Sequence, residues 1–129
     1  MTAFASIIAA GLESIRAATA TRVTYHRGTA WVRTTATQGR TKFDVTDSAG
    51  AVIQSRSIDF ILPAEELVLA GQLVTPKRGD RVKVPAARGK VNVFEVMRPD
   101  GSEDVWRYVD PACTTVRIHT HLVGVEDAP

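Results

Sequence analysis

A change in hydrophobic period near Thr21 constrains the fold of this chain more than any other feature. Before it, apolar residues recur three and four positions apart, which is the spacing of one helical face. After it, short segments alternate apolar and polar residues, and glycine and proline separate them. Many short strands after a single helix are typical of a small antiparallel β-barrel or sandwich. We therefore expect a mainly β fold of this kind with one N-terminal amphipathic helix.

The N-terminal stretch predicts a helix from about residue 3 to residue 19. Thr2 is a suitable N-cap, and alanine fills much of the segment. A helix this short and this weakly charged is not stable alone, so it must pack on the body or on a neighbouring protein. Its apolar face, which we treat as a candidate interface, carries Phe4, Ile7, Ile8, Leu12 and Ile15.

The β part is predicted from its turn residues. Gly28 ends the first strand, and segments 30–39 and 41–50 read as two strands of a hairpin joined at Gly39. Pro63 stops the next strand and begins one helical turn. Shorter strands follow, separated by proline with glycine at positions 76 and 79, 85 and 89, and 99 and 101.

Length predicts a single domain. With 129 residues, 44% of them hydrophobic, the chain is the right size for one core. We divide it into a helix (1–20), a β-barrel (21–123) and a flexible tail (124–129). We expect it to be soluble and made in a cytoplasm, because no leader or apolar run of roughly 20 residues is present. Cys113 cannot form an internal disulfide and is expected to be a small buried hydrophobe.

Basic residues gather in one segment of a chain whose formal net charge is only +2. Asp80 is the only acid among Lys77, Arg78, Arg81, Lys83, Arg88 and Lys90. We expect a basic loop that faces a partner or a channel, and a solvated surface loop is the alternative. The tripeptide Arg78-Gly79-Asp80 matches an integrin adhesion motif, but Pro76 and Gly79 explain it as turn chemistry.

No arrangement of residues in the sequence predicts catalysis, a cofactor or a metal site. His119 and His121 have the spacing of two ligands on one strand face, but no third ligand follows at a known spacing. Ser55 or Ser57 could be combined with a histidine and an aspartate, although no nucleophile-elbow motif surrounds either serine. We therefore expect a protein that is not an enzyme.

Aromatic residues beside arginine offer a binding alternative. Small β-barrels often bind single-stranded nucleic acid on such surfaces, and the candidates are Trp31 with Arg33 and the run Trp106-Arg107-Tyr108. Only 6% of the residues are aromatic, so we expect these side chains in the core. A nucleic-acid-binding barrel stays open, and salt-dependent binding to free DNA would identify it.

The order of elements from about Thr21 to Thr120 resembles the small head-tail joining proteins of tailed phages and prophages, also called head completion or stopper proteins. Four elements carry the resemblance: the strand Ile58-Asp59-Phe60-Ile61, the turn residues Pro76, Gly79 and Asp80, the segment VFEVM, and the terminal strand TTVRIHT.

The resemblance implies a structural protein of the virion neck, made in the host bacterial cytoplasm. Such proteins are β-barrels that form a ring between the portal or adaptor and the tail, continue the DNA channel, help to retain packaged DNA and dock the tail. They have no catalytic residues and no cofactor. The implied partners are the portal or adaptor ring, tail proteins, further copies of the chain and DNA in the channel, with no membrane and no small-molecule substrate. A tail terminator or tail completion protein is the alternative, for which we expect more helix packed on a sheet.

Overall fold

The computed structural model describes residues 20–46, 49–50, 52–98 and 104–128, with backbone only at 42–46 and 52–56. The predicted helix 3–19 and its apolar face (Phe4, Ile7, Ile8, Leu12 and Ile15) lie outside the described residues. No helix in the described ranges is long and apolar enough to cross a membrane.

The described chain is mainly β and antiparallel, as the alternating pattern predicts. Its strands are β1 (Thr21–Arg27), β2 (Ala30–Thr46), β3 (Val52–Pro63), β4 (Val68–Leu69), β5 (Gln72–Leu73), β6 (Arg81–Pro85), β7 (Lys90–Val96), β8 (Trp106–Tyr108) and β9 (Thr115–Asp127). Two 3-10 turns, η1 (Ala64–Glu66) and η2 (Ala87–Gly89), lie between them. The first of these is the helical turn expected after Pro63.

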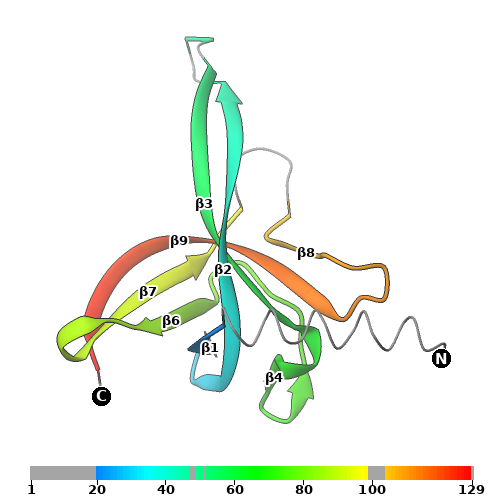
Figure 1. The fold of residues 1–129 in the computed structure, drawn as a ribbon, viewed down its shortest axis with the longest axis vertical. Coiled ribbons are helices and arrows are strands. Elements are labelled where there is room, and N and C mark those ends of the chain that lie inside the picture. The colour runs from blue at the N-terminus through cyan, green and yellow to red at the C-terminus, as the bar shows by residue number, and fades with distance from the viewer. Residues whose placement is uncertain (1–19, 47–48, 51, 99–103, 129) are drawn as a thin grey trace.

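The main sheet is ring-like over part of its length. Its strand order is β3-β2-β1-β6-β7-β9-β8, and β9 also pairs with β3, which joins the two sides of the sheet (Figure 1). That closing contact runs from Ile58 opposite Thr120 to Pro63 opposite Thr115. β4 and β5 form a separate small hairpin. Closing a sheet on itself removes exposed strand edges, which explains how a chain this short can be mostly strand.

β2 and β3 continue beyond the ring as a two-stranded arm, which we define as residues 41–46 and 52–57. The two strands stay paired from Thr41 opposite Ser57 to Thr46 opposite Val52. The pairing of β3 with β9, in contrast, ends at Ile58. Figure 1 shows the paired strands standing clear of the other strands at the top of the view. The arm therefore begins at the point where β3 and β9 part.

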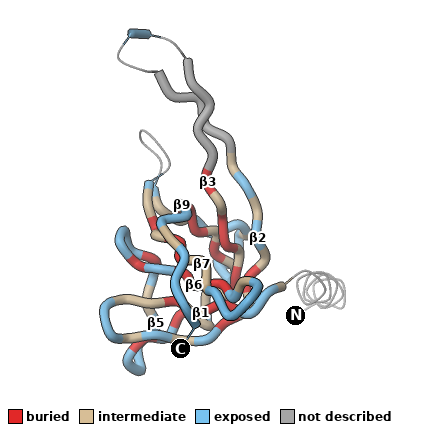
Figure 2. The backbone as a smooth tube through the Cα atoms, turned by 90° about the vertical axis from the view of Figure 1, so that its left-hand side faces the viewer, coloured by how far each residue is buried: buried red, intermediate tan, exposed pale blue. Residues whose placement is uncertain are grey.

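The core lies inside the ring and consists of side chains on alternate strand positions. Phe60 and Ile118 are opposite one another on β3 and β9 and are fully buried. The ring of Phe60 packs edge-on against Phe94 at 5.1 Å between centroids. Figure 2 shows the buried segments gathered in the body of the molecule, around β3, β7 and β9. The largest fully buried apolar side chains are Tyr25, Phe60, Leu62, Leu67, Ile118, Val82, Val96 and Val116.

The predicted hairpin at Gly39 is wrong. β2 runs through Gly39 without a break, and the connection to β3 comes after Thr46. Gly39 lies opposite Asp59, and a Cβ added to it would be only 3.1 Å from Nη2 of Arg117. Gly39 therefore lies within a strand and leaves room for the side chain of Arg117. Close packing of this kind is a reason for glycine in a strand, just as a turn is a reason for glycine between strands.

The flexible tail predicted for residues 124–129 is also wrong for its described part. β9 extends to Asp127, which lies opposite Lys90 on β7. The backbone N–H of Ala128 donates to the carbonyl of Gly89 at 2.8 Å. Polar residues at a chain end are typical of a flexible tail, but β7 supplies backbone partners for these residues.

Candidate functional site

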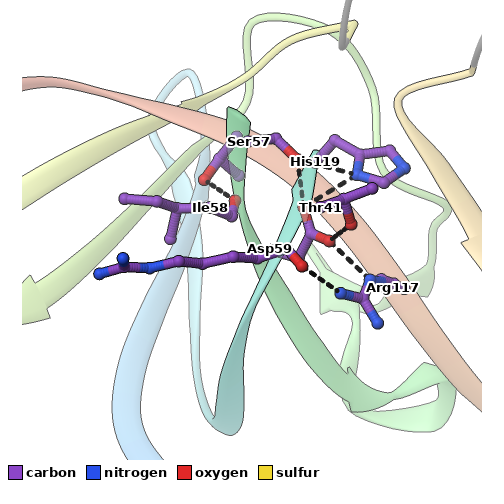
Figure 3. Close-up of polar contacts among 8 residues, drawn as sticks. Thr41, Ser57, Ile58, Asp59, Arg117 and His119 are labelled. Carbon is purple, nitrogen blue, oxygen red and sulfur yellow. Dashed lines mark hydrogen bonds and ion pairs between the residues drawn. The ribbon is translucent and has the colours of Figure 1, made fainter. Parts of the chain in front are cut away.

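Asp59 lies at the base of the arm and is fully buried. Its Oδ1 accepts hydrogen bonds from the Ser57 hydroxyl at 2.6 Å and from Nδ1–H of His119 at 2.9 Å. Its Oδ2 accepts from Nε of Arg117 at 2.6 Å and from the hydroxyl of Thr41. Figure 3 shows these side chains converging on the carboxylate from three strands. We call these five residues the Asp59 cluster.

The Asp59 carboxylate is held in its charged form. Burial by itself would raise its pKa, but hydrogen bonds from His119, Ser57, Thr41 and Arg117 together lower the pKa well below the ordinary value of an aspartate. The guanidinium of Arg117 adds an ion pair whose basic partner is largely buried. A buried carboxylate with two donors on each oxygen is fully satisfied, so the cluster favours one fixed arrangement of the three strands.

The same cluster brings together a serine, a histidine and an aspartate, which are the residue types of a hydrolytic triad. In such a triad one ring nitrogen binds the aspartate and the other faces the serine. Here Ser57 Oγ and Asp59 Oδ1 both lie at Nδ1 of His119, at 3.3 and 2.9 Å. Ser57 is also fully buried, out of reach of a substrate. The three residues are therefore not arranged as a hydrolytic triad.

The cluster joins the arm to the ring. Thr41 lies on β2, Asp59 on β3 and Arg117 on β9, so their contacts cross both boundaries of β3. Nη2 of Arg117 also donates to the carbonyl of Arg40 at 3.3 Å, beside the space left by Gly39. Sequence reasoning missed this site. The available signal was an aspartate between the apolar residues of β3, a position where a charge requires partners.

A second buried carboxylate, Asp80, fixes the turn that contains Arg78-Gly79-Asp80. It accepts from the Tyr25 hydroxyl at 2.6 Å, from Nε and Nη2 of Arg27 at 2.9 and 2.8 Å, and from the backbone N–H of Lys77 at 3.0 Å. Burial and the nearby carboxylate raise the pKa of Tyr25 far above its ordinary value. Gly79 has a φ of +93°, as the turn prediction requires. Because Asp80 points inward, this tripeptide cannot present its carboxylate to a receptor.

The six basic residues predicted as one loop occupy several elements. Lys77 and Arg78 lie in the turn before β6, and Arg81 and Lys83 lie on β6 itself. Arg88 is in η2, with a φ of +61°, and Lys90 begins β7. The segment is thus a turn and a hairpin rather than a single loop.

Half of this basic charge is compensated by acids of the same chain. Lys83 pairs with Glu126 at 2.6 Å, and Lys90 pairs with Asp127. Arg81 lies 3.6 Å from Glu95. Lys77, Arg78 and Arg88 are exposed and form no ion pair with the described residues. The charge available to a partner therefore divides between two ends of β6.

The other candidate residues do not assemble a metal site. His119 belongs to the Asp59 cluster, and His121 is opposite Glu95 on β7. Among the described residues, no group of three or more His, Cys, Asp or Glu could hold a metal ion. The prediction of a buried Cys113 is wrong: it is exposed, with a φ of +58°, in the turn between β8 and β9. Cys113 is exposed because it lies in this turn, which Asp110 stabilises by accepting from the backbone N–H groups of Thr114 and Thr115. The hydrophobic character of the cysteine side chain does not determine its position.

The tryptophans were both expected in the core, and they behave differently. Trp106 is partly buried against the core and packs edge-on with Tyr108 at 4.9 Å between centroids. Trp31 is 53% exposed, with the guanidinium of Arg33 at 5.6 Å from its ring centroid and the ring of His26 at 6.4 Å. The core prediction is therefore wrong for Trp31, because β2 presents that position to solvent, and it is wrong for Tyr108, which is also exposed.

Comparison with known proteins gives a family for this chain. A family model described as phage head-tail joining protein matches residues 5–127. A search of curated proteins found no match. The matched range includes the whole ring, the arm and both buried carboxylates. The chain therefore belongs to the phage head-tail joining proteins.

Proposed function

We propose that several copies of this chain assemble into an oligomeric ring in the phage neck, between the portal or adaptor and the tail. In this role it continues the DNA channel, helps to retain packaged DNA and provides a docking face for the tail. The observation that carries the proposal is the family match over residues 5–127. The pairing of β3 with β9, which makes the sheet partly ring-like, supports it, since a small β-barrel is the fold we expect for such a connector.

The arm gives the proposal a geometric basis. In the part of the chain that the structure describes, residues 41–46 and 52–57 pair only with one another. An element that extends beyond the body can reach a neighbouring subunit, the next ring or the channel. The Asp59 cluster at its base suits this role because it sets the direction of the arm.

We assign the remaining contacts to the exposed cations and the N-terminal segment. Lys77, Arg78 and Arg88 have no acidic partner among the described residues, so we propose that they meet an acidic surface of a neighbouring ring rather than DNA, which must slide. Arg81, Lys83 and Lys90 contribute less, because each already faces an acid. The apolar residues Phe4, Ile7, Ile8, Leu12 and Ile15 form the second proposed interface.

The first test is the copy number of the chain in purified particles and neck complexes, measured by mass spectrometry against the portal. A symmetric copy number supports the connector role, and absence from every particle fraction refutes it. The cation assignment is tested by changing Lys77, Arg78 and Arg88 to glutamine. A matched control changes three other exposed arginines, Arg40, Arg98 and Arg107, to glutamine. Equal assembly and DNA retention in the two variants would contradict the assignment.

The same mass spectrometry separates the connector from a tail terminator, and a binding assay with free DNA separates it from a nucleic-acid-binding protein. A tail terminator would be found with isolated tails rather than with portal-containing necks. The strands and 3-10 turns of the described residues favour the connector, because we expect more helix in a terminator. Nucleic-acid binding is favoured by the exposed Trp31 beside Arg33. That alternative requires the chain to bind free DNA. The affinity should fall steeply as the salt concentration rises, and it should also fall in the variant Trp31→Ala.

A further inference from the structure

An apolar groove runs between the segment that follows β5 and strand β8, and its volume is about 110 Å³. Leu67 and Val116, both buried, line it together with the exposed side chains of Leu73 and Tyr108. Among the described residues that line the groove, none is charged. Water in such a groove finds few polar partners, so apolar side chains displace it favourably.

The groove lies within a wider apolar surface. Val68 lies opposite Leu73 in the hairpin of β4 and β5, and Val109 follows Tyr108 at the end of β8. These four residues are half of the eight large apolar side chains that the described residues expose. Leu73 is 68% exposed, the largest value among the eight. Apolar surface gathered in this way marks a contact site rather than ordinary protein surface.

The segment before Ala20 offers an apolar face of the same kind. It lies outside the described residues, and its sequence predicts a helix from about residue 3 to residue 19. The match to the family model begins at residue 5, so most of the segment belongs to the sequence that the family shares. Glu13 and Arg16 are its only charged side chains, and their charges cancel. A nearly uncharged amphipathic helix suits an uncharged groove.

Residues 1–19 are long enough to reach the groove. Thr21 starts β1, and the strand register across β2 and β3 places it level with the part of β9 that contains Val116. The path from β1 through β2 and β3 to β9 crosses three strand spacings, or about 14 Å. A helix over residues 3–19 is about 25 Å long. The segment can therefore cover the groove of its own chain.

We infer that residues 1–19 dock on their own chain and cover the groove beside Leu73 and Tyr108. The segment is tethered a short distance from the groove, so its effective concentration there exceeds that of a free partner. The consequence for assembly rests on the proposed function. Docking keeps the apolar face of the segment from a neighbouring protein until a partner in the neck displaces it. The residues covered in this way are Phe4, Ile7, Ile8, Leu12 and Ile15.

Cys113 serves as a native probe of this contact. Its thiol is exposed and is the only one in the chain. The carbonyl of the next residue, Thr114, accepts from the N–H of Ala64, which lines the groove. A nitroxide attached to Cys113 of the full-length chain broadens the NMR signals of nearby amides. We expect it to broaden the amide signals between Phe4 and Ile15, to an extent that does not change on dilution.

Two substitutions test the contact from its two sides. Leu73→Asp and Ile8→Asp should each lower the docking equilibrium constant by at least about 30-fold, the factor expected for a dominant interface residue, so the broadening should disappear. Val125→Asp is the matched control, because Val125 is 58% exposed and lies near the other end of β9. Urea unfolding of each variant checks that the β body stays folded.

A mixed sample distinguishes docking within one chain from docking between chains. It contains isotope-labelled chain without the nitroxide and nitroxide-bearing chain without the isotope, and we expect no broadening in it. Broadening in this mixture would overturn the inference, because the segment would then cover the groove of another copy. A wild-type chain without broadening, or broadening that persists in Leu73→Asp or Ile8→Asp, would also overturn it. Absence of the chain from particles refutes the neck role and leaves the docking standing.

Discussion

Replacing Asp59 with asparagine should destabilise the protein strongly, although the two side chains have the same shape. Both oxygens of Asp59 face donors: Ser57 and His119 on one side, Arg117 and Thr41 on the other. Asparagine must turn its NH₂ group toward one side. Arg117 has no acceptor, so the NH₂ group has to face Ser57 and His119. The substitution removes the charge, and Ser57 and His119, which now donate to the carboxylate, would have to accept from the NH₂ group instead.

The expected loss follows from the burial of this ion pair. Removing one partner of a buried salt bridge typically costs about 3 to 5 kcal/mol, because the remaining charge stays uncompensated. Arg117 is 20% exposed, so water compensates part of its charge. We therefore expect the lower end, about 3 kcal/mol in the free energy of unfolding. Against a total of roughly 5 to 15 kcal/mol for an ordinary domain, the variant should still fold at 25 °C.

The pH dependence gives an independent check. Because the folded-state pKa of Asp59 is lower than the unfolded value, its stabilisation is complete above about pH 3.9 and is lost as pH falls below it. Each proton taken up on unfolding adds about 1.4 kcal/mol per pH unit to the slope. The wild-type chain should therefore lose stability more steeply than Asp59→Asn between about pH 4 and pH 2.

Urea unfolding followed by circular dichroism measures both quantities. Asp127→Asn is the control, because Asp127 is 82% exposed and its pairing with Lys90 should change stability by less than about 0.5 kcal/mol. The reasoning is refuted if Asp59→Asn costs less than about 1 kcal/mol, or if the acid slopes of the two proteins are the same. Either result would mean that the cluster is not closed in solution.

Three further outcomes follow from single contacts. Gly39→Ala should cost about 1 to 3 kcal/mol, since the new Cβ would be 3.1 Å from Nη2 of Arg117, and a double-mutant cycle with Arg117→Ala should recover most of that cost. Tyr25→Phe should cost about 1.5 to 3 kcal/mol by urea unfolding, because it removes a buried hydrogen bond to the charged Asp80, and no effect would contradict that contact. A maleimide should label Cys113 in the folded chain nearly as fast as in the unfolded chain, and strong protection would show that the thiol is buried after all.

Much of the strand pattern could be predicted from the sequence, because alternation and turn residues are local signals. The turn at Gly28, the stop at Pro63 and the turn at Gly79 all lie where their backbone preferences put them. Gly39 shows the limit of this reasoning. A glycine in a turn and a glycine that makes room for a distant arginine look the same in sequence, and only the pairing of β3 with β9 distinguishes them.

The ion pairs were harder to predict from the sequence, because the partners of each charged side chain lie on strands that are distant in the sequence. The prediction of one basic loop treated neighbours in sequence as neighbours in function. Lys83 forms an ion pair with Glu126, which is more than forty residues away in the sequence, and Lys90 forms one with Asp127. The pairing of β7 with β9 brings these acids close to the lysines. No local pattern indicates such pairs. The exposed Trp31 was missed for a related reason, since composition argues for aromatic residues in the core but does not say which face of a strand points inward.

The position of the Asp59 cluster connects these observations to function. β3 and β9 must pair firmly to close the ring and must then part so that the arm can extend. An apolar contact at that branch would tolerate sliding, because hydrophobic packing is not directional. A buried carboxylate with four donors from three strands has one satisfied geometry, and a one-residue slip of β3 would leave its donors unpaired. In the proposed function the arm reaches a defined neighbour, and this role would require a fixed arm direction. The free energy spent on burying a charge is then the cost of that specificity.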